Sequence, residues 1–225
     1  SQRSTAAWKS TRVSNVEVDA VLALLQLHSP RSQSDAEARL AALPAGERHT
    51  EEALAYAAWR RHDMAAARQH FAQAIALGAD NAKVFYDAAR ASLHSGNKDE
   101  ASIQYLKKAL ELYPTWTEAR LQLLDHYVLM ARYAEALNLA TSFKSISPSL
   151  ASRLFRAISY TEAMLKSLPR ARQSQQRARQ FARNDFDQLE CDKLDNFIAQ
   201  MDAAGSDADT LRTFLAQQMR DAQLR

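Results

Sequence analysis

The amino-acid sequence predicts an all-α protein, a solenoid of stacked helical hairpins, and two observations lead to this prediction. The 225 residues include only 4 glycines and 5 prolines, whereas average usage would give roughly 27 of the two together. Sheet-rich folds need turn residues roughly every 8–12 positions, and phosphate-binding loops need clustered glycines, so both are excluded. The second observation is an internal repeat of 34 to 35 residues.

The repeat appears as columns of apolar residues that keep their spacing across four copies. Ala67, Ala101, Ala136 and Ala171 are separated by 34, 35 and 35 residues. Two further columns keep the same step: Leu54, Ala88, Leu123 and Ile158, and Leu77, Leu112, Ile146 and Phe181. Small residues at such positions allow helices to approach to roughly 8–10 Å. A generic Ala-rich helical bundle is the alternative, but a bundle needs no fixed period.

Each copy is expected to form two amphipathic helices joined by a short turn. In the first copy Asp63 is placed to cap the second helix, and in the second copy Gly96 interrupts the chain between helices. Pro148 is expected to end the third copy. In the fourth, Ser167 is the expected N-cap, and Pro169 follows in the first turn, where a proline is tolerated.

A helix–turn–helix unit of this length and pattern resembles the tetratricopeptide repeat. The first copy carries the resemblance through Leu54, Ala55, Ala67, Phe71 and Ala74, and the fourth has Gln175 where the family has an aromatic residue. The resemblance implies a right-handed α-α superhelix. It divides the central part of the chain into four repeats: 48–81, 82–116, 117–151 and 152–185.

The two ends are expected to be atypical, because the terminal units of a solenoid must cover one apolar face. Residues 1–15 are expected to be a flexible segment, and 16–47 a degenerate hairpin whose second helix is about a turn short. Residues 186–225 are expected to form capping helices. The first of these would use one apolar face, made of Phe186, Leu189, Leu194, Phe197, Ile198 and Met201, and end at Gly205. The second would follow a capping box at Ser206 and Asp209 and carry a stripe through Leu211, Phe214, Leu215 and Met219.

The resemblance also implies a concave groove lined by the first helix of each pair. The candidate partner-binding residues are Tyr56, Trp59, Tyr86, Arg90, Leu93, Asp125, Arg156 and Tyr160. Aromatic and Arg side chains are the types that anchor peptide interfaces. The alternatives are a groove that binds nothing or one filled by the chain's own terminal helix. Glu52 and Tyr56 occupy the places where one subclass of the family holds a C-terminal carboxylate with Lys and Asn, so the sequence disfavours that subclass.

An arginine-rich run precedes an acid-rich one. Residues 169–183 hold five arginines and no acid, and 184–209 hold eight acids and one lysine. The arginines could form a nucleic-acid or anionic-lipid patch. The interpretation we favour is that two adjacent helices complement each other electrostatically, because the arginines are spread around their helix.

No catalytic residue, metal site or cofactor is predicted. The six histidines lack the spacing of metal ligands, most are expected at turns or on the surface, and Cys191 is expected to be an inert part of the cap helix. The net charge of +3 implies no general attraction to nucleic acid. The apolar stretch 20–30 is too short for a membrane span, which needs about 20 residues.

The predicted function is therefore a non-catalytic scaffold that binds a protein or peptide partner. A second hypothesis is an accessory segment of a larger enzyme or of a secretion or assembly protein, since the sequence begins with Ser1 and is expected to be a fragment. A third, a nucleic-acid-binding repeat, is disfavoured because the polar groove residues do not recur. The chain is expected to be soluble, cytoplasmic or periplasmic, and a monomer or weak dimer.

Overall fold

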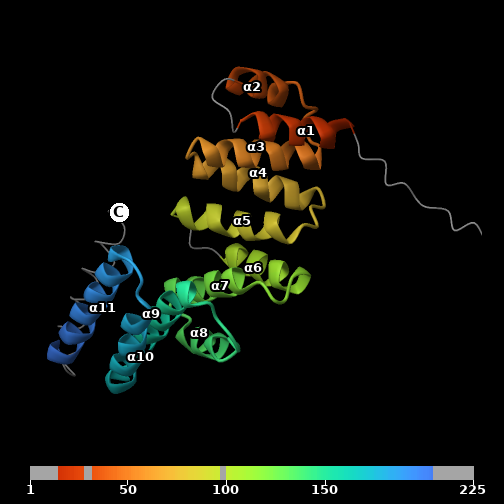
Figure 1. The fold of residues 1–225 in the computed structure, drawn as a ribbon. Coiled ribbons are helices and arrows are strands. Elements are labelled where there is room, and N and C mark those ends of the chain that lie inside the picture. Colours follow the sequence, from red (N-terminus) through yellow and green to blue (C-terminus); the bar gives the residue numbers. More distant parts are fainter. Residues whose placement is uncertain (1–14, 28–31, 97–99, 205–225) are drawn as a thin grey trace, which may run out of the picture. The chain divides into compact units, whose positions relative to one another are not determined.

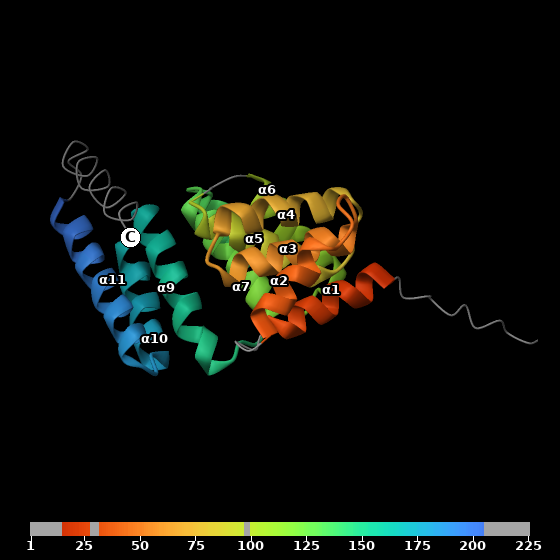
Figure 2. The same ribbon diagram turned by 90° about the horizontal axis from the view of Figure 1, so that it is seen from above.

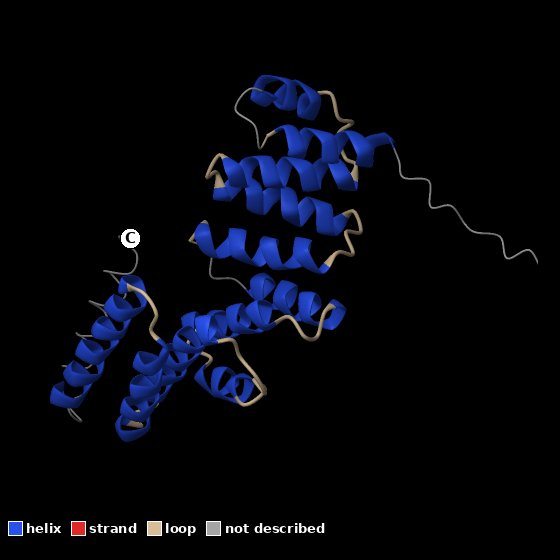
Figure 3. Cartoon of the chain, viewed as in Figure 1, coloured by secondary structure: helices blue, strands red, loops and turns tan. Residues whose placement is uncertain are grey.

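The computed structural model describes residues 15–27, 32–96 and 100–204. Within these ranges the chain forms eleven α-helices and no strand (Figure 3), so the predicted all-α fold is confirmed. The chain divides into two compact units, Ser1–Pro114 and Thr115–Arg225. Residues 1–14, most of the expected flexible segment, and 205–225, with the expected last helix, lie outside the described residues.

The first unit contains six helices (Figure 1). They are α1 (Asn15–Gln26), α2 (Gln33–Ala41), α3 (Arg48–Arg60), α4 (Met64–Ala76), α5 (Ala82–His94) and α6 (Glu100–Leu112). Helix α2 has 9 residues and α4 has 13, so the second helix of the first hairpin is short, as predicted. Helix α3 packs against α4, and α4 against α5.

Alanines surround one large core side chain, Phe71, where α3, α4 and α5 meet. Phe71 of α4 is fully buried, and so are Ala55 and Ala58 of α3, Ala67 of α4 and Ala91 of α5. The small side chains let the three helices close around the ring, which is the packing that the alanine column predicts.

Four of the hairpins have the same backbone conformation at one residue of the turn between their helices. His62, Gly96, Ala131 and Lys166 all have φ between 57° and 77°, and their spacings match those of the alanine column. Around the three residues that are not glycine, the following amide donates back to the carbonyl five residues earlier, for example Asp63 to Ala58 at 3.0 Å. This hydrogen bond is the Schellman ending of a helix.

Within residues 115–204, the second unit has five helices: α7 (Thr117–Leu129), α8 (Tyr133–Ala140), α9 (Pro148–Met164), α10 (Leu168–Phe181) and α11 (Asp185–Ala204). Helices α9, α10 and α11 pack side by side (Figure 2). The expectation for Pro148 was wrong, because Pro148 begins α9 instead of ending the third copy. Proline suits the first position of a helix, where its missing N–H has no intrahelical partner to lose.

Two further expectations about side chains need correction. Of the apolar face predicted for α11, Leu194, Phe197, Ile198 and Met201 are buried, but Phe186 and Leu189 are 66% and 52% exposed. Both lie in the first turns of α11, away from the cluster that the buried residues form with α9 and α10. His126 departs from the surface placement expected for most histidines: it is buried in α7, and its Nδ1 contacts the Gln122 carbonyl oxygen at 2.8 Å.

Candidate functional site

The first helices of two successive hairpins, α3 and α5, bring four candidate groove residues together within the first unit. Tyr56 and Trp59 come from α3, one turn apart on the same face, and Tyr86 and Arg90 come from α5 in the same way. Lys83 of α5 completes the cluster, with its Nζ 4.6 Å from the centre of the Tyr56 ring. We call these five residues the α3–α5 row.

A buried carboxylate, Asp87 of α5, connects the row. Asp87 is only 4% exposed. The Tyr56 hydroxyl donates a hydrogen bond to its Oδ2 at 3.0 Å, Lys83 Nζ donates to the same oxygen, and Arg90 Nη1 lies 3.6 Å from Oδ1. A buried carboxylate is tolerated only when it is paired and hydrogen-bonded. Asp87 therefore holds α3 and α5 side chains in one arrangement.

The pKa of Tyr56 reflects this environment. Burial of the phenol raises its pKa well above the ordinary value, and the Asp87 carboxylate raises it further by repelling a phenolate and by accepting the phenol proton. Beneath the hydroxyl, the Tyr56 ring meets Phe71 edge-on with centroids 5.1 Å apart. The residue is thus fixed both at its ring and at its hydroxyl.

The guanidinium of Arg90 lies over two aromatic rings. Its central carbon is 4.8 Å from the centre of the Trp59 ring and 5.6 Å from that of Tyr86. Such cation–π contacts hold the cation without consuming its N–H donors. Trp59 also meets His94 edge-on at 5.8 Å, and both burial and the nearby Arg90 charge lower the pKa of His94. Leu93, the fifth candidate in this unit, is half-buried on α5.

Toward α1, the surface of α3 carries Glu52 beside Arg48 and His49. Glu52 is half-buried, and burial raises its pKa, an effect that the His49 and Arg48 charges oppose. His49 Nε2 lies 3.7 Å from Glu17 Oε2 of α1. This contact places Glu17 at the border between α1 and the row-bearing face of α3.

In the second unit, the candidate residue Asp125 of α7 is paired with Arg153 of α9. Arg153 Nε donates to Asp125 Oδ2 at 3.0 Å, and its Nη2 donates to the same oxygen and to Gln122 Oε1 at 3.1 Å. Burial raises the pKa of Asp125, and the guanidinium opposes that rise. The pair connects α7 to α9 as Asp87 connects α5 to α3.

The other two candidates of the second unit, Arg156 and Tyr160 of α9, face helix α11. Arg156 Nη1 donates to Asp187 Oδ1 at 3.1 Å, and both side chains are about 15% exposed. The Tyr160 ring stacks on Phe197 with centroids 5.0 Å apart, and burial raises the pKa of Tyr160 to about 12. This part of the predicted surface is therefore in contact with the chain's own helix.

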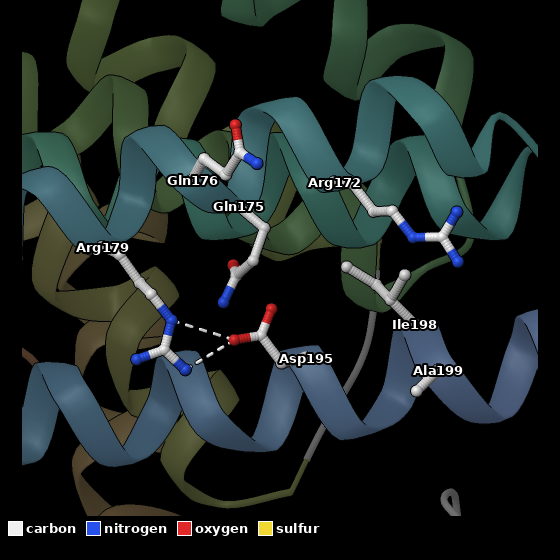
Figure 4. Close-up of a pocket in the computed structure, with 7 residues that line it drawn as sticks. All are labelled: Arg172, Gln175, Gln176, Arg179, Asp195, Ile198 and Ala199. Carbon is white, nitrogen blue, oxygen red and sulfur yellow. Dashed lines mark hydrogen bonds and ion pairs between the residues drawn. The ribbon is translucent and has the colours of Figure 1, made fainter.

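Two arginines of α10, Arg172 and Arg179, pair with acids of α11, as the favoured interpretation predicts. Arg172 donates to Asp202, and Arg179 Nε donates to Asp195 at 2.9 Å while its Nη2 donates to Asp192 at 2.5 Å. Figure 4 shows these arginines at a cavity of about 320 Å³ between the two helices. Gln175 closes its inner side and donates to the Cys191 carbonyl oxygen at 2.7 Å. Cys191 itself is buried, with a free thiol.

Lys83 of the α3–α5 row and Asp87, the carboxylate that connects the row, were not among the candidate residues chosen from the sequence. Their spacing contained the information, because Lys83 and Asp87 are four residues apart and Asp87 and Arg90 three apart, the spacings at which helical side chains pair. Such pairs are common on solvated helices, so spacing alone does not indicate that Asp87 is buried.

No arrangement for metal binding or membrane crossing appears in the part of the chain that the structure describes. There, no group of three or more His, Cys, Asp and Glu side chains is arranged to hold a metal ion. In the same residues, no helix combines the length and apolar character that crossing a bilayer requires.

Comparison with known proteins identifies the fold. No family model and no curated protein matches the sequence. Among solved structures, YrrB, described as a TPR protein with an unusual peptide-binding site, matches with a TM-score of 0.68 and 20% identity, over 78% of this chain and 90% of its own. PilW, a type IV pilus biogenesis factor, matches with a TM-score of 0.58 and 17% identity, over 95% and 96%. PilF of Pseudomonas aeruginosa matches with a TM-score of 0.56 and 18% identity, over 92% and 97%.

These likenesses, together with the helical hairpins, show that the chain has the fold of the tetratricopeptide-repeat solenoids. The predicted fold class and family resemblance are thereby confirmed. The division into four numbered repeats and the choice of groove residues stay predictions.

Proposed function

We propose that this chain is a non-catalytic scaffold that binds a protein or peptide partner on the α3–α5 row. The observation that carries the proposal is the Arg90 guanidinium held over Trp59 and Tyr86 beside the buried Asp87. Aromatic and Arg side chains dominate the binding energy of protein interfaces, and side chains already fixed in place lose little entropy on binding. The fold shared with YrrB, a peptide-binding TPR protein by its description, supports the same function.

In the second unit the support for partner binding is weaker. Arg156 and Tyr160 are engaged by Asp187 and Phe197 of α11. A partner that used them would have to displace a half-buried ion pair and a ring stack. We therefore centre the proposal on the first unit, with Asp125 and its partner Arg153 as a secondary contact.

The test is capture of a partner from an extract of the source cells by the tagged chain. We expect the wild-type chain to retain a partner that the variant Tyr86→Ala plus Arg90→Ala loses. Leu165→Ala plus Arg170→Ala is the matched control, because both residues are exposed and lie in the second unit. Circular dichroism must show equal helix content in all three proteins. Capture that survives the loss of Tyr86 and Arg90 would contradict the proposal.

A second candidate is a role as an assembly factor or as an accessory segment of a larger assembly protein. It is favoured by the likeness to PilW and PilF, which covers more than 90% of this chain and of each of theirs. The open reading frame on either side of these residues, together with the identity of captured partners, distinguishes the two candidates. A catalytic domain in the same reading frame would favour the accessory segment.

A nucleic-acid-binding role has little support in the structure. Arg172 and Arg179, two of the five arginines of the run, already pair with acids of α11. Binding to phosphates would have to compete with these pairs, and three nearby carboxylates would repel the ligand.

A further inference from the structure

Helix α1 carries an open apolar stripe. Val18, Val21, Leu22 and Leu25 follow the i, i+3, i+4, i+7 spacing of one helix face, and they are 45%, 51%, 40% and 63% exposed. The opposite face of α1 is also apolar, since Ala20 and Ala23 are buried in a cluster with Ala53 and Ala57 of α3. A helix that is apolar on two faces is normally covered on both, so the open stripe indicates a binding surface.

The stripe borders the α3–α5 row. Glu17 precedes Val21 by one turn and lies on the same side of α1. Its carboxylate is 3.7 Å from His49 of α3, and His49 precedes Tyr56 by two turns on one side of that helix. The side of α1 that carries Val21 therefore adjoins the side of α3 that carries Tyr56. Helices α1 and α3 also lie side by side in Figures 1 and 2.

The other end of this surface presents a cation with unused donors. Among the residues that the structure describes, Arg90 donates no hydrogen bond: its contacts are two ring faces and an ion pair at 3.6 Å. Its side chain is 36% exposed, whereas that of Asp87 is 6% exposed and already accepts from Tyr56 and Lys83. A ligand carboxylate can reach the edge of the guanidinium, while a ligand cation cannot reach Asp87.

We propose that the surface formed by the α1 stripe and the α3–α5 row binds a peptide segment with an apolar part and an acidic part. The apolar side chains of the peptide pack on α1, and its carboxylate binds Arg90. This inference rests on the proposed function and specifies its partner. The carboxylate is that of an Asp or Glu side chain within the segment. A second copy of this chain fits less well, since pairing two α1 stripes leaves Arg90 without a ligand.

The direct test uses synthetic peptides and the full chain. The reference peptide has a Leu- and Val-rich block followed by Asp and Glu, with an amidated C-terminus. The second peptide has Asn and Gln in place of the acids, and the third has Ser in place of the apolar block. The fourth carries neutral side chains and a free C-terminal carboxylate. Fluorescence anisotropy measures the dissociation constant of each.

We expect the reference peptide to bind at least about tenfold more tightly than the peptide with Asn and Gln and the peptide with Ser. Its binding should weaken with added salt. Tightest binding of the fourth peptide would show that the ligand is a C-terminus and would overturn the assignment to an acidic side chain. Equal affinities for all four would overturn the inference.

Variants then assign each preference to its surface. Arg90→Gln should abolish the preference for acid and keep the preference for the apolar block. Val21→Ser plus Leu25→Ser should do the reverse. The controls are Arg170→Gln and Leu165→Ser, exposed residues of the second unit, and both should bind like the wild type. An acid preference that persists in Arg90→Gln contradicts the assignment.

The remaining outcomes separate this inference from the proposed function. If no designed peptide binds, but partner capture still depends on Tyr86 and Arg90, the proposed function stands. The inferred apolar and acidic make-up of the ligand is then wrong. If neither depends on these residues, both fail. If sedimentation shows a dimer that Val21→Ser plus Leu25→Ser dissociates, the stripe is a self-interface and the inference is overturned.

Discussion

At the residue scale, Asp87 determines the geometry of the candidate site. Its carboxylate receives the Tyr56 hydroxyl from α3 and the Lys83 ammonium from its own helix, and it lies beside Arg90. Removing one partner of a buried polar group leaves the other unsatisfied, which costs more than the original interaction contributed. Asp87 thus fixes two of the aromatic and cationic side chains before any partner arrives.

Replacing Asp87 should loosen this arrangement. We expect Asp87→Ala to lower the free energy of unfolding by roughly 1–3 kcal/mol, since a buried ion pair and hydrogen bond are lost. It should also lower the pKa of Tyr56, although burial, the larger cause, would keep that pKa above its ordinary value. Urea unfolding and the ultraviolet absorbance of the phenolate measure the two effects. Asp80→Ala, at a side chain that is 86% exposed, should change stability by less than about 0.5 kcal/mol.

His94 provides a pH-dependent probe of the same site. Burial and the Arg90 charge lower its pKa in the folded state. Below the unfolded-state pKa of about 6.5, the unfolded chain therefore binds more protons, and the free energy of unfolding should fall as the pH falls. NMR titration of His94 should show a higher pKa in Arg90→Gln than in the wild type, and no change in Arg170→Gln. An unchanged His94 pKa in Arg90→Gln would contradict the inference that the Arg90 charge lowers the pKa of His94.

At the scale of elements, the hairpin turns repeat a backbone conformation more faithfully than a residue type. Gly96 suits the left-handed conformation, but His62, Ala131 and Lys166 adopt it in the equivalent turns. A side chain in this region costs about 1–2 kcal/mol. Tertiary packing of the two helices imposes the turn, so three of the four copies accept local strain.

Glycine at one of these turns should therefore stabilise the protein. We expect Ala131→Gly to raise the free energy of unfolding by about 1 kcal/mol, and Gly96→Ala to lower it by a similar amount. An added Cβ at Gly96 would have no heavy atom within 4 Å, so that effect comes from the backbone alone. Ala72→Gly, inside α4, should destabilise instead. Thermal and urea unfolding compare the stabilities of the three variants. A lower stability of Ala131→Gly would contradict the inference that Ala131 is strained in the left-handed conformation.

Helices α10 and α11 show how much of an element's role charge patterns can predict. The opposite charges of the two runs led to the prediction that they pair, and Arg179 with Asp192 and Asp195 confirms it. The sequence did not indicate where on α11 the packing begins. Phe186 and Leu189 continue its apolar pattern, yet they remain exposed beyond the cluster at Leu194 and Phe197.

At the scale of the whole molecule, the chain consists of two compact units, and the complete α3–α5 row belongs to the first. In repeat proteins each unit contacts only its neighbours, so stability is roughly a sum over repeats and their interfaces. A fragment that keeps the helices packed against α3 and α5 should keep the α3–α5 row.

The fragment 1–114 should therefore fold and retain the row. We expect a helical circular-dichroism spectrum, cooperative urea unfolding, and a Tyr56 pKa raised above its ordinary value, as in the full chain. Asp87→Ala in the fragment is the control and should lower that pKa. A fragment that is unfolded, or whose Tyr56 ionises at the ordinary value, would contradict the independence of the unit.

The sequence by itself determined the helical fold, the period and the core around Phe71, because apolar spacing and scarce glycine and proline leave stacked hairpins as the arrangement that buries Ala67 and Phe71. It also pointed to Tyr56, Trp59, Tyr86 and Arg90, through their positions within the repeat. Only the tertiary structure decided which side chains are buried, exposed or paired. It buried Asp87, opened the stripe of α1, and paired Arg156 and Tyr160 with α11. Exposure depends on which neighbour packs against a face, and that contact joins residues far apart in the chain, beyond the reach of local spacing.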